Sequence, residues 1–262
     1  MSTITQHAPG TFCWPELATS DQAGARNFYS KLFGWTPDEQ DMGGGQTYTM
    51  LQKADQAVGA LYGLNEEQRN RNIPPHWNAY VSVANADAAA AKAKQLGGTL
   101  LMEPFDVMDA GRMATVQDPT GAIVSIWEAK KHIGATVLDE PGSLCWTELI
   151  TRDTSKAGTF YSSLFGWKRD EMKMPEMTYT VFKRDDKPAG GMMPTLPNMG
   201  PNMPSVWLTY FAVEDTDRSA DKAKSLGAKV KNGPLDIPNV GRFAVLEDPQ
   251  GATFAILGPN KS

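Results

Sequence analysis

Two glutamates stand out because each lies within an apolar segment that alternates as a β-strand does. Glu16 occurs in Trp-Pro-Glu-Leu and Glu148 in Trp-Thr-Glu-Leu. A carboxylate is costly to bury without a partner. One interpretation pairs these glutamates with two arginines that also recur, Arg112 and Arg242. The other makes Glu16 a general base, because a dry, tryptophan-lined site raises a carboxyl pKa and suits it to remove a proton from carbon beside a carbonyl.

Aromatic and sulfur-containing side chains accompany these glutamates. Trp14 and Trp146 lie two residues before them, so each shares a strand face with its glutamate. Their flat rings suit stacking on a planar ligand. Residues 172–203 contain seven methionines, Met192 among them. Such flexible thioethers form an adaptable apolar lining, and a copper(I) thioether site is the alternative use of so many soft ligands.

Charge and cysteine content exclude several classes of protein. The formal net charge is -5, and the basic residues are scattered, so the chain offers no basic field for nucleic acid or an anionic membrane. No run of 18 apolar residues and no apolar leader occurs, which indicates a cytoplasmic protein. Cys13 and Cys145 lie inside apolar strands and are expected to be separate core residues.

The sequence that surrounds these residues occurs twice in the chain. Residues 28–35, Phe-Tyr-Ser-Lys-Leu-Phe-Gly-Trp, return with one change at 160–167. A duplication this clear predicts two similar domains, at residues 10–129 and 142–259. Each half is close to the size at which a domain becomes marginally stable, so we expect the halves to pack together.

Within each half the hydrophobic pattern changes period in a set order. A strand over residues 12–17 leads to a helix that Asp21 caps and Gly34 ends, and short β-like runs follow. The order then starts again, with a strand over residues 77–83 and an Ala/Lys-rich helix ending at Leu96. The sequence therefore predicts four βαβββ units and an α+β fold.

Several of these features occur together in one known superfamily. Besides the paired units and the repeated octet, Asp-Pro-X-Gly at 118–121 and 248–251 predicts a type I turn before each last strand. With these motifs, residues 11–258 resemble the vicinal oxygen chelate superfamily, which includes glyoxalase I, bleomycin-resistance proteins and extradiol dioxygenases. The chain is similar to a two-domain subgroup of mycobacterial and streptomycete proteins labelled hydroxylases or glyoxalase-like. The resemblance implies two tandem glyoxalase-like domains, each with a sheet curled around a cup.

The resemblance also implies where a metal would bind. Members with a metal place ligands on the first strand, on the first strand of the second unit and at the end of the last strand. These places hold Glu16, Asn78 and Glu128 in the first half, whereas the second half keeps only Glu148. An amide binds first-row metals weakly, so a divalent metal held by Glu16 and Glu128 is one alternative, with His76 as a substitute nitrogen ligand.

Three functions stay open. One is capture of a planar or apolar small molecule by a Trp/Met-lined cup. Its predicted ligand-binding residues are Trp14, His76, Asn78, Tyr80, Trp146, Glu148 and Met192. Another is a glyoxalase-like lyase or related oxygenase that uses Glu16 and Glu128 as metal ligands or as acid and base, with Arg112 as a further predicted catalytic residue. The third is an interaction module with filled cups. The sequence leaves open the ligand and whether the chain forms a homodimer.

Overall fold

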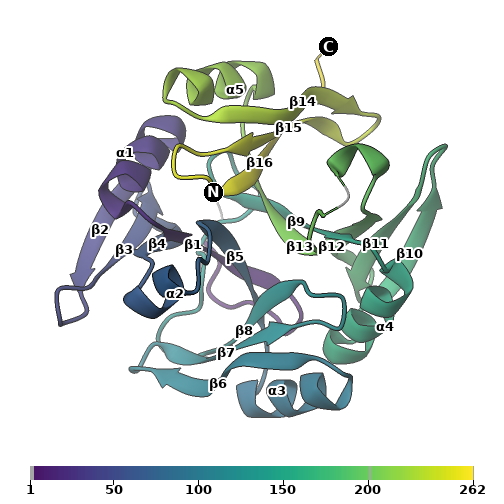
Figure 1. Ribbon diagram of the computed structural model, residues 1–262, viewed down its shortest axis with the longest axis horizontal. Coiled ribbons are helices and arrows are strands. Elements are labelled where there is room, and N and C mark those ends of the chain that lie inside the picture. The colour runs from purple at the N-terminus through teal and green to yellow at the C-terminus, as the bar shows by residue number, and fades with distance from the viewer. Residues whose placement is uncertain (1–2, 201, 262) are drawn as a thin grey trace.

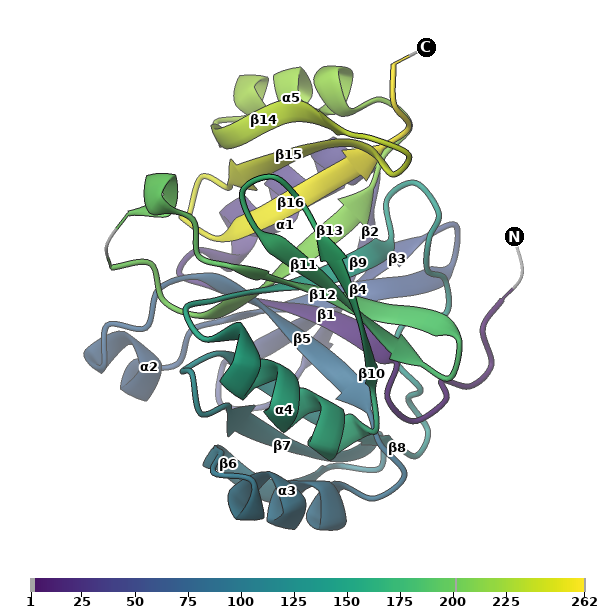
Figure 2. The same ribbon diagram turned by 90° about the vertical axis from the view of Figure 1, so that its right-hand side faces the viewer.

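The computed structural model describes residues 3–200 and 202–261. In this part of the chain each half forms one eight-stranded sheet, and four of the five α-helices pack on the two sheets (Figure 1). Both sheets are strongly curled, as the two perpendicular views show (Figure 2). The predicted α+β fold of two tandem domains with paired βαβββ units is confirmed.

The first half consists of two βαβββ units. The first unit comprises β1 (Phe12–Thr19), α1 (Gln22–Phe33), β2 (Thr36–Asp41), β3 (Thr47–Lys53) and β4 (Gln56–Gly63). After the short helix α2 (Glu66–Asn70), the second comprises β5 (His76–Ser82), α3 (Ala86–Gln95), β6 (Thr99–Val107), β7 (Gly111–Gln117) and β8 (Ile123–Ala129). The sheet order is β2-β3-β4-β1-β5-β8-β7-β6, so the two units meet along their first strands.

The second half repeats this arrangement. Its elements are β9 (Leu144–Thr151), α4 (Thr154–Phe165), β10 (Lys168–Lys173), β11 (Thr178–Arg184), β12 (Lys187–Pro194), the 3-10 helix η1 (Pro197–Met199), β13 (Val206–Ala212), α5 (Thr216–Ser225), β14 (Lys229–Ile237), β15 (Gly241–Glu247) and β16 (Thr253–Gly258). The sheet order is β10-β11-β12-β9-β13-β16-β15-β14. None of the helices in the described chain has the length and apolar character needed to span a bilayer.

Helix α1 begins and ends where the sequence predicts. The Asp21 side chain accepts a hydrogen bond from the Gly24 backbone N–H at 3.0 Å, and Gly34 takes a left-handed φ of 75° at the C-cap. Helix α4 repeats both features with Asp153 and Gly166. The buried face of α1 is the predicted one, made of Ala25, Phe28, Tyr29 and Leu32.

Both Asp-Pro-X-Gly sequences form the predicted tight turns. The backbone N–H of Gly121 donates to the carbonyl of Asp118 at 3.0 Å, and Gly251 donates to Asp248 at the same distance. Each turn joins the last two strands of its sheet, β7 to β8 and β15 to β16.

The two cysteines are separate free thiols, as predicted. Cys13 is fully buried and Cys145 is partly buried. Burial raises the pKa of the Cys145 thiol to about 12, so it is not a reactive thiolate at neutral pH.

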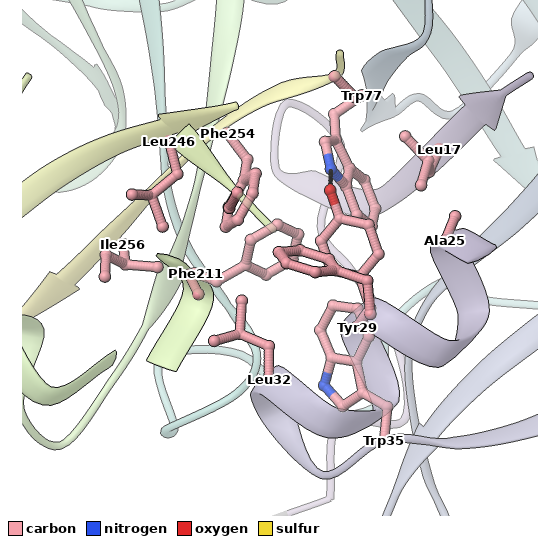
Figure 3. Close-up of a cluster of buried hydrophobic side chains, with 14 of the residues drawn as sticks. Leu17, Ala25, Tyr29, Leu32, Trp35, Trp77, Phe211, Leu246, Phe254 and Ile256 are labelled. Atoms are coloured by element: carbon pink, nitrogen blue, oxygen red, sulfur yellow. Dashed lines mark hydrogen bonds between the residues drawn. The ribbon is translucent and has the colours of Figure 1, made fainter. Parts of the chain in front are cut away.

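Each βαβββ unit packs its helix-covered face against a unit of the other half. Helix α1 lies beside α5, and α3 lies beside α4 (Figure 1). One buried cluster joins Tyr29 of the first unit to Phe211 and Phe254 of the fourth (Figure 3). A second cluster joins Val124 of the second unit to Phe160 of the third. The largest cores of the protein are therefore shared between its halves, as expected for halves of marginal size.

The tyrosine of the repeated octet connects the halves. The Tyr29 hydroxyl donates to Asp248 Oδ2 in the other half at 2.9 Å and accepts from Trp77 Nε1 at 2.9 Å (Figure 3). In the second copy, the Tyr161 hydroxyl accepts from Trp207 Nε1 at 2.8 Å. Both tryptophans are core residues.

Candidate functional site

The two faces of each sheet differ in what covers them. On β1, Leu17 belongs to the core beneath α1, whereas its neighbours Trp14 and Glu16 lie on the opposite, inner face. We call the inner face of the first sheet the first cup. The matching face of the second sheet, which carries Trp146 and Glu148, is the second cup.

A buried carboxylate with two tyrosine partners lies in the first cup. Glu16 is 8% exposed, and its Oε1 and Oε2 accept hydrogen bonds from the hydroxyls of Tyr48 and Tyr80, both at 2.7 Å. Trp14 Nε1 donates to the Tyr48 hydroxyl at 3.3 Å. The structure thus brings Trp14, Glu16 and Tyr80 together, as their strand positions predict, and adds Tyr48 from β3.

The second cup contains the same network. Glu148 is 7% exposed and accepts from the Tyr179 hydroxyl at 2.7 Å and from the Tyr210 hydroxyl at 2.9 Å. Trp146 Nε1 donates to the Tyr179 hydroxyl at 3.1 Å. A Cβ atom at Gly191 would lie 2.0 Å from the Tyr179 hydroxyl, so the absence of a side chain there makes room for this tyrosine.

Sequence reasoning missed three of these four tyrosines. A signal for two of them was present, because Thr-Tyr-Thr recurs at 47–49 and 178–180 beside each polar hairpin. Tyr210 occupies the place on β13 that Tyr80 occupies on β5, since each pairs with the tryptophan of its neighbouring strand.

Burial governs the charge state of both glutamates. It raises the pKa of Glu16 and of Glu148 above the ordinary glutamate value, while the hydrogen bonds from the tyrosines oppose this rise. In the part of the chain that the structure describes, no salt bridge joins either carboxylate to a lysine, arginine or histidine. The tyrosines are the polar partners of both glutamates.

The predicted ion pairs between the repeated arginines and the cup glutamates are wrong. Arg112 Nε donates to Asp87 Oδ2 at 2.7 Å, and Arg242 Nε donates to Asp217 Oδ2 at 2.7 Å. Both aspartates lie in the first turn of a helix, α3 or α5. These arginines therefore tie helix starts to the sheets, and the predicted catalytic role of Arg112 beside Glu16 has no support in the geometry.

Glu128 lies on the helix-covered face of the first sheet, contrary to the prediction. Its Oε2 accepts a hydrogen bond from the backbone N–H of Ala86, the first residue of α3, at 2.8 Å. On the same strand Ile126 packs beneath α3, whereas Trp127 belongs to the first cup. Because Glu128 shares the face of Ile126, the hypothesis that it joins Glu16 as a metal ligand or as an acid-base partner is wrong.

The side chain of β8 that faces Asn78 in the first cup is Ser125. Asn78 Nδ2 donates to Ser125 Oγ at 2.8 Å, and Thr115 Oγ1 lies 3.1 Å from the same oxygen. Among the described residues, no group of three or more His, Cys, Asp or Glu side chains could hold a metal ion. Neutral amides and hydroxyls bind divalent cations weakly. This donor set does not fit the metal that the resemblance implies.

Two other predicted ligand-binding residues have different roles. His76 Nδ1 lies 2.8 Å from the carbonyl oxygen of Pro74, at the partly exposed start of β5. Met192 is 2% exposed and belongs to the core that includes α4. The next residue, Met193, belongs to the second cup, since neighbours in a strand point to opposite faces. The methionine-rich segment thus presents Met193 to the cup in place of Met192.

The first cup is closed at one end by the segment that connects the halves. The Ala135 backbone N–H donates to the carbonyl of Cys13 at 2.7 Å. The ring of His132 packs edge-on against Trp14, with centroids 4.6 Å apart, and its carbonyl accepts from Trp127 Nε1 at 2.8 Å. Trp14 is consequently only 4% exposed.

The second cup leaves two residues more exposed than the first cup does, and its lining is more apolar. Cys145 and Trp146, which match the buried Cys13 and Trp14, are both partly exposed. Leu208 and Ala255 occupy the strand positions that Asn78 and Ser125 hold in the first cup. Around them lie apolar and aromatic side chains from several strands and from the segment after β12: Met177, Tyr179, Met193, Leu196, Met199, Met203, Phe243, Val245 and Leu257.

Two kinds of bacterial protein are similar in sequence to this chain over nearly its whole length. It is 42% identical to "Putative glyoxylase CFP32" of Mycobacterium tuberculosis, over 97% of both chains. It is 34% identical to the anthracycline biosynthesis protein DauV of Streptomyces sp., over 97% of this chain and 95% of DauV.

Solved structures share the fold at low sequence identity. The Mn(II)-bound glyoxalase of Novosphingobium aromaticivorans aligns with a TM-score of 0.68 and 14% identity, over 97% of this chain and 83% of that one. A variant of homoprotocatechuate 2,3-dioxygenase from B. fuscum aligns with a TM-score of 0.68 and 17% identity, over 98% and 74% of the chains. Residues 11–126 and 143–256 match the sequence model of one family. The chain thus belongs to the Glyoxalase/Bleomycin resistance protein/Dioxygenase superfamily and carries its domain twice.

Proposed function

We propose that the protein captures a planar, largely apolar small molecule in the second cup. The observation that carries this proposal is the contrast between two matched tryptophans. Trp14 is buried beneath the connecting segment, whereas Trp146 is partly exposed within an apolar lining. An apolar site with a few placed polar groups is the usual form of a small-molecule site.

The side chains of the second cup suit a ligand of this shape. Trp146, Tyr179 and Phe243 supply flat aromatic surfaces, and Met199 and Met203 supply flexible thioethers on the segment between β12 and β13. Glu148 and its tyrosines give the cup a polar point against which a ligand can be oriented. The first cup lacks this apolar character because Asn78 and its hydroxyl partners occupy the corresponding place.

The names of the streptomycete relatives support the same class of ligand. They are called anthracycline biosynthesis proteins, and an anthracycline contains a planar system of fused rings. We carry this class of ligand, a planar ring system, over to the present chain as part of the proposal.

Tryptophan fluorescence tests the proposal directly. Titration with 1,4-dihydroxyanthraquinone should quench the wild-type protein, because the ring system stacks against Trp146. W146F should remove most of the quenching and weaken binding by roughly 1 kcal/mol, the scale of one aromatic contact. W14F is the matched variant in the first cup. Quenching that W14F removes and W146F leaves intact would place the ligand in the wrong cup, and absence of any binding would contradict capture.

A further inference from the structure

Glu148 is a buried acid without a basic partner. It is 7% exposed, and its two polar contacts are phenol hydroxyls, which donate hydrogen bonds but carry no charge. Within residues 3–200 and 202–261, no salt bridge connects it to a lysine, arginine or histidine. A buried charge left uncompensated is strongly unfavourable. The ionised form of Glu148 therefore has no compensating positive charge among the described residues of the second cup.

The surroundings of Glu148 are also suited to a cation. Trp146 and Tyr179 are linked to it through hydrogen bonds, and Phe243 lies in the same cluster. Aromatic faces attract positive charge through their quadrupoles, most strongly when water is excluded. Leu208 stands where the first cup has a polar amide, so the acid is the main polar feature of an aromatic and aliphatic lining.

Both carboxylate oxygens can still accept a hydrogen bond. Each accepts one bond from a tyrosine, and a carboxylate oxygen has two lone-pair sites. The two tyrosines hold the carboxylate in a fixed orientation, because Tyr179 is itself fixed by Trp146 Nε1. A donor that enters the second cup meets an acceptor that is already positioned.

We infer that the ligand of the second cup is an organic cation, a protonated amine on a planar apolar body, and that Glu148 is its counter-ion. This inference rests on the proposed capture of a planar molecule and adds the charge of the ligand. The ammonium group donates to Glu148 while the ring system lies against Trp146 and the methionines. A neutral molecule of the same shape leaves the acid uncompensated and binds more weakly.

Two matched probes test the charge of the ligand without any variant. Isothermal titration calorimetry at pH 7 compares 2-(aminomethyl)naphthalene, which is cationic, with 2-naphthalenemethanol, which is neutral and has the same ring system. We expect the amine to bind at least about tenfold more tightly, which corresponds to a cation–π and ion-pair gain near 1.4 kcal/mol. Equal affinities would overturn the inference and leave capture standing. Binding of neither probe would overturn both.

Three variants then locate the charge that the amine recognises. E148Q preserves the shape of the side chain and removes its charge, so it should lower the affinity for the amine about tenfold and leave that for the alcohol nearly unchanged. D221N removes one acidic charge elsewhere in the same half, on the exposed surface of α5 where Asp221 pairs with Lys224, and should change neither affinity. If E16Q instead of E148Q abolishes the preference for the amine, the assignment to the second cup is overturned.

Discussion

Glu16 and Glu148 are buried acids, and no salt bridge among the described residues involves either of them. Glu16 and Glu148 lie on inner strand faces, and each is held by a pair of tyrosine hydroxyls. Burial disfavours the ionised form of each acid, and the hydrogen bonds from tyrosine favour it. Because burial is the larger effect, the native protein binds protons at these residues more tightly than the unfolded chain does.

This difference predicts a pH dependence of stability. As pH rises from the ordinary glutamate pKa toward the raised native pKa, the unfolded chain ionises first, and the stabilising effect of the protonated carboxyl groups is lost. The free energy of unfolding of the wild type should therefore fall with pH relative to that of the double variant E16Q/E148Q. Urea unfolding of both proteins between pH 4 and 8 measures the difference.

Asp217 provides a control, because its contribution to stability changes with pH in the opposite direction. Its hydrogen bond from Arg242 lowers its pKa to about 2, so its stabilising effect is present at neutral pH and lost as pH falls. D217N should thus differ from the wild type mainly above pH 4. A difference between the wild type and E16Q/E148Q that stays constant, or grows more favourable to the wild type with rising pH, would contradict the charge states inferred for the cups.

The hydrogen bonds of the cup tyrosines also predict how a single substitution changes stability. Y179F removes the hydroxyl that donates to Glu148 and accepts from Trp146, so two polar groups of the second cup lose a partner. We expect a loss of about 1–3 kcal/mol in the free energy of unfolding. Y62F is the control, because among the described residues the Tyr62 hydroxyl takes part in a single, long hydrogen bond, from Gln68 Nε2 at 3.5 Å. Equal stabilities of Y179F and Y62F would show that the network contributes nothing.

At the scale of residues, the sequence predicts part of the cup and misses the rest for a physical reason. Alternation along one strand correctly places Trp14 beside Glu16. It does not say which face of a sheet a helix covers, so it cannot correct the position beside Glu16 that the resemblance implies for Glu128. Nor does it say which side chains reach across an intervening strand, so Tyr48 on β3 was missed as a partner of Glu16 on β1.

At the scale of elements, the start of α3 shows how a strand residue and a helix depend on each other. The Asn85 side chain accepts from the Ala88 N–H at 2.7 Å, and Glu128 from the end of β8 accepts from the Ala86 N–H at 2.8 Å. Two of the free N–H groups of the first turn are thereby satisfied, and the acid complements the positive end of the helix. Arg112 adds an ion pair to Asp87 in the same turn.

This arrangement predicts that Glu128 contributes to stability and not to metal binding. E128A should lower the free energy of unfolding by about 0.5–2 kcal/mol, as the loss of a helix cap does. E128Q retains an oxygen acceptor and should lose less. Elemental analysis of untagged protein should give the same divalent metal content for the wild type and E128A. A metal that is stoichiometric in the wild type and absent from E128A would contradict this assignment.

The elements themselves were predictable because their signals are local. Asp21 and Gly34 mark the ends of α1 through the backbone conformations that helix ends require, and the turn after Asp118 follows from the proline and glycine beside it. The partner of each element is not a local property. The octet in α1 predicts a helix end from neighbouring residues alone. The hydrogen bond of Tyr29 with Asp248 joins residues far apart in sequence, so no local signal predicts it.

At the scale of the whole molecule, the four units are paired in two different ways. Each sheet joins consecutive units, the first with the second and the third with the fourth. The cores beneath the helices join the first unit with the fourth and the second with the third. Every unit therefore has one partner through backbone hydrogen bonds and another through side-chain packing. The two cups lie on the faces that neither core uses.

This double pairing predicts that the halves do not fold independently. A polypeptide of residues 1–129 retains its sheet contacts but exposes the apolar side chains that α5 and β16 cover in the full chain, among them Tyr29. Because a half of this size has little other core, we expect no cooperative unfolding transition for it in urea. The full chain should unfold in a single transition when followed by both fluorescence and far-UV circular dichroism.

Coexpression with residues 130–262 is the control that separates a missing partner from a damaged chain. If the shared cores are what residues 1–129 lack, the two fragments should copurify and regain a cooperative transition, since both clusters can then form. Y29F in the fragment pair should weaken their association, because Asp248 loses the hydroxyl that reaches it across the halves. A cooperative unfolding transition for residues 1–129 alone would contradict the prediction, because the first sheet and its cup would then be sufficient for a stable fold.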